Sequence, residues 1–348
     1  MNEYIQLLKL LISVPSLSRN EQDAALLIRQ FLDHSGVKFD LKANNTWVRN
    51  LHWKEGLPVI LLNSHIDTVK PAGGYTRDPF LPDLENGVLY GLGSNDAGGA
   101  LVTLLAVFMY FNRLENLPFN LIYAATAEEE ISGTNGLESI LAELGPLNLA
   151  IVGEPTQMKM AIAEKGLMVL DCTAHGKSGH AAREEGENAL YKAIDDIEKI
   201  RNYRFEKTSS VLGTVKLSVT MINAGTQHNV VPDKCSFVVD VRTNEFYCNQ
   251  DAFTIIDKLL VSDVNPRSFR LNSSGISVEH SIVQRGISLG LSYYGSPTTS
   301  DQAVIPYPSV KIGPGDSARS HTANEYILIS ELEEGFRIYI DLLTDLRI

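Results

Sequence analysis

Residues 58–67 read Pro-Val-Ile-Leu-Leu-Asn-Ser-His-Ile-Asp, a short apolar run that leads directly into a histidine and an aspartate. Two more apolar runs, Leu121–Ala125 and Leu147–Val152, lead into acidic segments, and a helical run, Ala100–Leu114, lies between the first two. Strands that are apolar on both faces and alternate with helices are typical of a doubly wound sheet. The sequence therefore predicts an α/β fold.

The N-terminal segment precedes the first of these strands and predicts two amphipathic helices. Apolar residues at helical spacing mark Asn2–Val14, and Pro15 ends that helix. Ser18, with Glu21 three residues later, has the pattern of a capping box for a second helix, which Gly36 ends.

The middle of the chain has a different pattern. Strand-like and helical stretches follow one another in the order βαββαβ, which is the ferredoxin-like arrangement: Met168–Thr173, Asn188–Arg201, Val215–Ile222, the alternating residues 235–242, Ala252–Leu260 and Ser268–Ile276. We expect this domain, residues 165–276, to be inserted into the doubly wound domain, which residues 1–164 and 277–348 form around a mixed sheet.

Composition excludes several classes of protein. The 348 residues contain 30 Lys and Arg against 42 Asp and Glu, a net charge of −12, which disfavours nucleic acids and anionic membranes as partners. The cysteines are three and scattered, which predicts neither a disulfide framework nor a cysteine-rich zinc site. The densest apolar run, Ala100–Phe111, is far below the ~20 residues of a membrane helix, and no signal peptide is recognised. We expect a cytoplasmic protein.

Ligand-type side chains follow each of the apolar strands. His65 and Asp67 follow the first, Glu128–Glu130 the second and Glu154 the third, while Asp96 directly precedes a helix. Because the carboxyl ends of parallel strands meet at one edge of the sheet, these side chains should converge. Imidazoles and carboxylates without thiolates suit Zn²⁺, Co²⁺ or Mn²⁺, and several carboxylates can hold two ions.

These segments also carry a family resemblance. In order along the chain they resemble the signatures of the co-catalytic metallopeptidase/deacylase family, which includes acetylornithine deacetylase, succinyl-diaminopimelate desuccinylase, aminoacylase and glutamate carboxypeptidases. The matching segments span nearly the whole chain: His65-Ile-Asp67, Asp96-Ala-Gly-Gly99, Glu128-Glu129-Glu130, Gly153-Glu154-Pro155, Ser178-Gly-His180, Asn229-Val-Val-Pro232, Asp240-Val-Arg242, Thr299-Ser-Asp301, Gly313-Pro-Gly315 and His321-Thr-Ala-Asn-Glu325.

The resemblance implies a role for each ligand-type residue. One metal ion would be bound by His65 and Glu154, the other by Glu130 and His321, and Asp96 would bridge them. Residues two apart in an extended segment project to the same side, so Asp67 would accept a proton from the His65 ring and fix its tautomer. Adjacent residues point in different directions, so Glu129 would act as the general base while Glu130 binds metal.

The resemblance further implies substrate contacts in the inserted domain. His180, which is otherwise an ordinary surface histidine, would hydrogen-bond the oxyanion, either within its own chain or from a partner subunit. Arg242, otherwise one half of a surface ion pair, would bind a substrate carboxylate together with Asn229, and Thr299 would lie near that carboxylate. The inserted domain is therefore expected to serve as a lid and to form a homodimer.

Two motifs depart from the family pattern. The usual Asp-Met-Lys-Gly is Asp96-Ala-Gly-Gly99, so the lysine is absent at position 98, and the usual Asp-Glu-Glu begins with Glu128. Neither change removes an expected ligand or the base. They mean that the residues around the metal ligands, and the substrate, cannot simply be inferred from other members of the family.

The leading functional prediction is a two-metal amidohydrolase that removes an acyl group from an N-acyl amino acid. The chain length and the residues of the motifs resemble those of the acetylornithine deacetylase branch. This resemblance implies an acetyl or succinyl group on ornithine or citrulline as the substrate, and a role in arginine biosynthesis. A dipeptidase or carboxypeptidase of the same family, and a succinyl-diaminopimelate-type desuccinylase, would use the same ligands and base. A non-catalytic metal- or small-molecule-binding homologue is the remote alternative.

Overall fold

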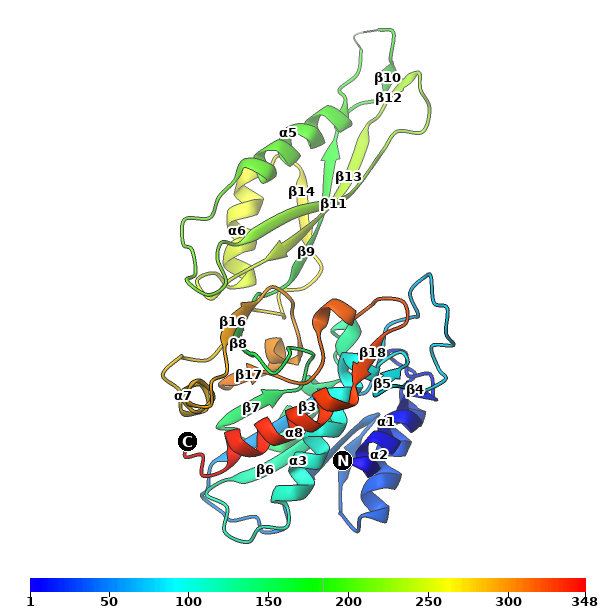
Figure 1. Ribbon diagram of the computed structural model, residues 1–348. Helices are drawn as coiled ribbons and strands as arrows, with labels where there is room; N and C mark the ends of the chain where they lie inside the picture. Colours follow the sequence, from blue (N-terminus) through cyan, green and yellow to red (C-terminus); the bar gives the residue numbers. More distant parts are fainter. Residues whose placement is uncertain (184) are drawn as a thin grey trace. The chain divides into compact units, whose positions relative to one another are not determined.

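The computed structural model describes residues 1–183 and 185–348, which divide into two compact units. Unit 1 comprises Met1–Ile162, Gly275–Tyr294 and Ser300–Ile348. Unit 2 comprises Ala163–Ser274 and the short segment Gly295–Thr299. Figure 1 shows the chain coloured along the sequence, with many of the helices and strands labelled.

The largest sheet is mixed, as predicted, and has the order β1-β2-β6-β3-β7-β17-β8-β15, with β16 beside β8. Its centre consists of parallel strands, because β3 pairs in parallel with both β6 and β7, and β7 with β17. The strands are β1 (Asp40–Lys42), β2 (Asn45–Arg49), β3 (Val59–His65), β6 (Asn120–Thr126), β7 (Leu149–Val152), β8 (Met160–Glu164), β15 (Ser274–Gly275), β16 (Tyr293–Ser296) and β17 (Ser309–Lys311).

A small antiparallel sheet of three strands also belongs to unit 1. Its order is β18-β5-β4, formed by β4 (Asp83–Glu85), β5 (Val88–Tyr90) and β18 (Tyr326–Leu328). Strand β5 pairs with β18, although the two lie far apart in the sequence. Asp96 follows β5 by a few residues, and His321 precedes β18.

Helix α3 (Gly99–Phe111) is the central helix of unit 1. All of its residues except Tyr110 are buried. A helix that is apolar all round lies inside a protein core, and α3 contacts β3 and β6 on one side and α1 and α8 on the other. The stretch Ser94–Phe111 is long and apolar enough to cross a membrane, but 89% of it is buried inside the protein, as in a core helix.

The remaining helices of unit 1 are amphipathic or short. They are α1 (Asn2–Ile12), α2 (Gln22–His34), α4 (Leu141–Leu144), α7 (Ser281–Ser288) and α8 (Ile329–Leu343). The other face of the sheet is covered by residues 137–147, where Leu137, Ile140 and Leu144 pack against Trp47 and Ile122. Both faces of the parallel strands are therefore buried, which explains their continuous apolar sequence.

The start of α2 differs from the prediction. The capping box at Ser18 and Glu21 is wrong, because α2 begins at Gln22 and no side chain caps it. The Oγ of Ser18 instead donates to Asp67 at 2.7 Å. The carboxylate of Glu21 accepts the backbone N–H of its neighbour Arg19 at 2.5 Å.

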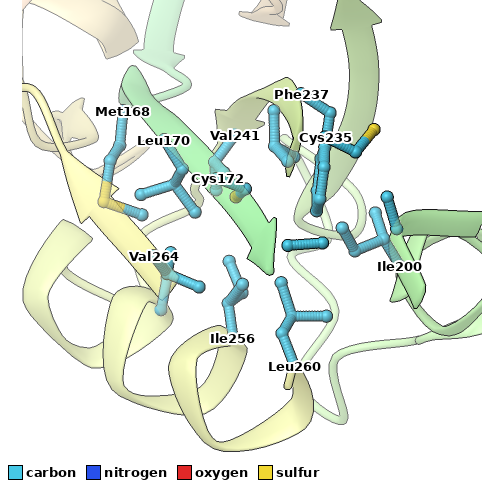
Figure 2. Close-up of a cluster of buried hydrophobic side chains, with 14 of the residues drawn as sticks. Met168, Leu170, Cys172, Ile200, Cys235, Phe237, Val241, Ile256, Leu260 and Val264 are labelled. Atoms are coloured by element: carbon cyan, nitrogen blue, oxygen red, sulfur yellow. The ribbon is translucent and has the colours of Figure 1, made fainter. Parts of the chain in front are cut away.

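Unit 2 is built around an antiparallel sheet of order β11-β13-β9-β14, whose elements follow one another as βαββαβ. Buried residues alternate along β9 and β13 and form a core with α5 and α6, which cover one face of the sheet; Figure 2 shows part of this core. The elements are β9 (Met168–His175), α5 (Ala189–Asn202), β11 (Lys216–Ala224), β13 (Lys234–Arg242), α6 (Asn249–Leu259) and β14 (Asp263–Pro266), with a small pair formed by β10 (Gly179–His180) and β12 (Val230–Val231).

The last strand of unit 2 lies earlier in the chain than the sequence predicts. The structure has β14 at Asp263–Pro266, and within the predicted Ser268–Ile276 only the two-residue β15 is a strand. Asp, Asn and Pro are poor strand formers, so propensity disfavours the true strand. Pairing of Val264 with Cys172 of β9, and its burial in the core of unit 2, stabilise it there.

Candidate metal centre

Four parallel strands end at one edge of the sheet of unit 1, and a predicted site segment follows three of them. In the register of the sheet, His65 at the end of β3 pairs with Thr126 of β6, and Asn63 pairs with Val152 of β7. Glu128–Glu130 therefore follow β6, and Glu154 follows β7, at the same edge as His65. This is the position at which open α/β sheets bind ligands.

Asp96 reaches this edge from the irregular turn Ser94–Gly98, which immediately precedes α3. Gly93 has a φ of 75°, a conformation that favours glycine, and opens the turn. A Cβ at Gly98 would clash with the carbonyl oxygen of Gly93. On this backbone the turn therefore leaves no room for a side chain at position 98.

His65 is buried and lies opposite three carboxylates. Its Nε2 lies 3.3 Å from Asp96 Oδ1, 3.8 Å from Glu154 Oε1 and 3.9 Å from Glu129 Oε2. Among the described residues this nitrogen has no hydrogen-bond partner. A buried imidazole nitrogen without a partner is unusual, and its place among carboxylate oxygens points to a cation.

His321 lies on the other side of Asp96. Its Nε2 is 3.1 Å from Glu130 Oε2 and 3.7 Å from Asp96 Oδ2. The two oxygens of Asp96 therefore face different imidazoles. The structure brings together all five predicted ligands and Glu129, although they come from segments far apart in the sequence.

The electrostatics of this cluster fit divalent cations. Burial, with the neighbouring carboxylates, raises the pKa of Glu129 well above its usual range and that of Glu154 to about 8, although His65 partly offsets both shifts. The hydrogen bond to Glu130 raises the pKa of His321 to about 9. Potential ligand atoms of His65, Asp96 and Glu130, and of His65, Glu129 and Glu154, lie within 4.8 Å of one another. Crowded buried carboxylates beside imidazoles are a donor set that Zn²⁺ and similar ions stabilise.

Asp67 contacts the site through different atoms from those expected. The nearest oxygen to His65 Nδ1 is the backbone carbonyl of Asp67, at 2.9 Å, while the carboxylate Oδ1 is 3.5 Å away. The carboxylate accepts the backbone N–H groups of Glu129 at 3.0 Å and Glu130 at 3.1 Å. Asp67 thus holds the turn that carries the proposed base and one proposed ligand.

The four predicted substrate residues lie in unit 2, in two pairs. His180 and Asn229 are exposed and adjacent, since β10 pairs with β12 and the N–H of Ala181 donates to the carbonyl of Asn229 at 3.0 Å. Arg242 Nη1 donates to Thr299 Oγ1 at 3.3 Å. The Nε and Nη2 of Arg242 donate to both carboxylate oxygens of Asp240, at 2.8 and 3.1 Å.

Two buried acids of unit 1 belong to this region but had no predicted role. Asp301 Oδ2 accepts from Asn63 Nδ2 at 2.8 Å and from Thr126 Oγ1 at 3.0 Å, which ties together the ends of β3 and β6. Glu325 Oε1 accepts the backbone N–H groups of Asn95 and Asp96. Each acid belongs to a segment that resembles a family motif, Thr299-Ser-Asp301 or His321–Glu325. These motifs are the sequence feature that could have indicated a role for them.

The model of peptidase family M20/M25/M40 matches residues 61–345. The chain belongs to this family. It is therefore a metal-dependent hydrolase of amide or peptide bonds, and the predicted family resemblance is confirmed. The remote alternative of a non-catalytic binding protein has no support from this membership.

Relatives of this M20 hydrolase have several activities by name. A succinyl-diaminopimelate desuccinylase of Wolbachia pipientis subsp. Culex pipiens is 27% identical, over 96% of this chain and 91% of its own length. A [LysW]-lysine/[LysW]-ornithine hydrolase of Sulfurisphaera tokodaii is 29% identical, over 82% and 81%. A Bacillus subtilis protein, described as a dinuclear metal-binding peptidase, has a similar structure with a TM-score of 0.75 and 16% identity, over 98% and 97%.

Proposed function

We propose that this M20 hydrolase uses two divalent ions, Zn²⁺ in the first place and Co²⁺ or Mn²⁺ otherwise, to remove the acyl group from an N-acyl amino acid. The observation that carries the proposal is the position of Asp96, whose Oδ1 faces His65 and whose Oδ2 faces His321. With Glu154 beside His65 and Glu130 beside His321, each imidazole has a carboxylate of its own. One bridging carboxylate between two such pairs is the donor set of a two-ion centre.

The ions would polarise the scissile carbonyl and lower the pKa of a bound water molecule. Glu129 is the proposed general base, because it is buried in the cluster and its carboxylate oxygen lies 3.9 Å from His65 Nε2. Its burial raises its pKa, which suits a group that takes a proton from the attacking water and passes it to the leaving amine. Asp67 would keep Glu129 in place through the hydrogen bond to its backbone.

Arg242 is the proposed anchor for a carboxylate of the substrate. Asp240 occupies the Nε and Nη2 edge of the guanidinium, and Thr299 accepts from Nη1. The remaining N–H groups of the planar guanidinium then have a defined direction, as bidentate recognition of a carboxylate requires. Asn229 and His180 are proposed to contact the substrate as well, His180 at the oxyanion, with a homodimer formed through unit 2.

The first-choice substrate is an N-acylated diamino acid of the N-acetylornithine type, in arginine biosynthesis in the cytoplasm. The name of the Sulfurisphaera relative, which acts on a lysine or ornithine conjugate, supports a diamino acid product. The desuccinylase relative supports N-succinyl-diaminopimelate, and with it lysine biosynthesis, as the second candidate. A dipeptidase or carboxypeptidase is the third candidate, because the matched family is described as a peptidase family.

A panel of substrates tests these proposals. The Zn²⁺-loaded protein is incubated with N-acetylornithine, N-acetylcitrulline, N-succinylornithine, N-succinyl-diaminopimelate and two dipeptides, and the released amine is measured. Strong preference for one N-acyl amino acid supports a deacylase and identifies both the acyl group and the amino acid. Hydrolysis of the dipeptides alone would make the protein a peptidase, and hydrolysis of none would overturn the proposed substrate class.

A further inference from the structure

Glu325 is a buried carboxylate whose hydrogen-bond partners are backbone groups of the turn that carries Asp96. Its side chain lies just before β18, and the residue is only 2% exposed. Oε1 accepts the N–H of Asn95 at 2.9 Å and the N–H of Asp96 at 3.0 Å. Two bonds from one oxygen to consecutive N–H groups fix the orientation of the peptide group between Asn95 and Asp96.

Additional hydrogen bonds tie this turn to the same C-terminal stretch. The carbonyl of Glu325 accepts the N–H of Gly91 at 3.0 Å. The side chain of Asn95 accepts the N–H of Asp316 at 2.9 Å and donates to the carbonyl of Asp316 at 3.1 Å and to Ser320 Oγ at 3.3 Å. Residues 91–96 and 316–325 are thus joined at several points, and Glu325 is the residue of this stretch whose side chain accepts the backbone N–H of Asp96.

His321 stands on the same stretch, four residues before Glu325. The stretch therefore presents an imidazole to Asp96 Oδ2 and, through Glu325, holds the peptide group from which the Asp96 side chain projects. Asp96 places one oxygen near each of two histidines, so a small rotation of its backbone would move one oxygen away from its histidine. A bond to the backbone N–H of Asp96 restricts that rotation.

We propose that Glu325 is a positioning residue that holds Asp96 between the two metal ions and so couples the His321 segment to the bridging carboxylate. The proposal rests on the proposed role of Asp96 and His321 as metal ligands. It assigns Glu325 no contact with metal or substrate. Partners of metal ligands typically change metal affinity or activity by about 10–100-fold when they are removed.

The test measures Zn²⁺ binding by calorimetry and Co²⁺ binding by its visible absorption, in the full-length wild type and in Glu325→Ala, Glu325→Gln and Glu325→Asp. The matched control is Asp196→Ala. Asp196 is a buried carboxylate of unit 2 that also accepts consecutive backbone N–H groups, those of Val261 and Ser262. Thermal unfolding and circular dichroism of each variant report its fold.

Glu325→Ala should lower the affinity for at least one ion by about 10–100-fold, whereas Asp196→Ala should lower only thermal stability. Glu325→Gln keeps an oxygen that can accept both N–H groups and should recover most of the affinity. Glu325→Asp is one methylene shorter and should not. If Glu325→Ala fails to fold, the comparison of the Gln and Asp variants decides the same question. With the best substrate of the panel, Glu325→Ala should lower kcat while KM changes little.

Unchanged metal affinity in Glu325→Ala would overturn the proposal. So would a Gln variant as defective as the Ala variant, because the negative charge rather than the hydrogen bonds would then matter. The binding measurement needs no substrate. A wild type that binds two ions but hydrolyses nothing in the panel would therefore contradict the proposed substrate class alone, and the role of Glu325 would still be decided.

Discussion

The carboxylate of Asp67 accepts the backbone N–H of Glu129 at 3.0 Å, across 62 positions of sequence. It also accepts the N–H of Glu130 at 3.1 Å and the hydroxyl of Ser18 at 2.7 Å. A short 3₁₀ turn of three residues, Glu129–Ile131, carries both glutamates, and a turn that short has little stability of its own. Asp67 therefore orients the proposed base and a proposed ligand through their main chain.

Replacement of Asp67 should affect catalysis although its carboxylate is not a proposed ligand. Asp67→Ala removes the acceptor for both N–H groups, so we expect kcat to fall by about 10–100-fold, as for other partners of metal ligands. Ser18→Ala removes only one of the donors to Asp67 and should have a much smaller effect. Steady-state kinetics on the preferred substrate check this, and equal rates for Asp67→Ala and the wild type would contradict the positioning role.

Glu129→Gln tests the general base. The amide has nearly the shape of the carboxylate but cannot take up a proton, so both ions should still bind while kcat falls by about 10²–10⁴-fold. Metal content of the purified variant and its kcat are measured together. Unchanged turnover would eliminate Glu129 as the base, whereas loss of metal would mean that Glu129 is a ligand.

Chelation tests the dependence on metal in solution. Prolonged dialysis against a chelator should abolish hydrolysis, and Zn²⁺ or Co²⁺ added back should restore it, because the five proposed ligands are side chains that remain in the protein. Titration of the restored activity against added Zn²⁺ should reach its plateau near two ions per chain. A plateau near one ion would show that Asp96 does not bridge a pair in the active form.

Sequence patterns predicted the parts of this protein that depend on local residue order. The continuous apolar runs of β3, β6 and β7 predict parallel strands buried on both faces, and the position of His65 at a strand end follows directly. Partners that meet only in three dimensions leave no such pattern. Glu325 and the N–H of Asp96 are 229 positions apart, and Ser18 resembles a helix cap but donates to Asp67.

Stability of unit 2 should depend on pH through Asp196. Burial alone would raise the pKa of this carboxyl, but hydrogen bonds from Lys199, Ser262 and the N–H of Val261 outweigh burial and hold the pKa below its usual value. A carboxyl with a lowered folded-state pKa stabilises the protein above its unfolded-state pKa of about 3.9, and this contribution is lost as the pH falls through the folded-state value.

Asp196→Asn should therefore lower the free energy of unfolding by about 1–3 kcal/mol at pH 7, the usual cost of weakening buried hydrogen bonds to a charged group. The difference from the wild type should shrink below about pH 4, where Asp196 itself becomes protonated. Urea unfolding followed by circular dichroism at several pH values measures this. A difference that is constant down to the acid limit of the native state would contradict the charge-dependent contribution.

The edge of the sheet of unit 2 is the proposed dimer surface. Strand β11 is an edge strand and exposes Met221 and Ile222, which are 64% and 50% accessible. On α5, Tyr191 and Ile194 are also exposed. An edge strand with exposed apolar side chains is a template for pairing with another chain, and a second copy of this chain would cover these residues.

Met221→Lys should convert the proposed dimer to a monomer at micromolar concentration, because pairing would bury the introduced charge without a partner. Sedimentation velocity measures the change, and Leu51→Lys, at an exposed leucine of unit 1, is the matched control that should leave the oligomeric state unchanged.

If His180 acts in the site of the partner subunit, the monomeric variant should also lose most of its turnover, as His180→Ala should in the dimer. A wild type that is a fully active monomer would eliminate the partner-subunit role of His180 and leave it to act, if at all, within its own chain.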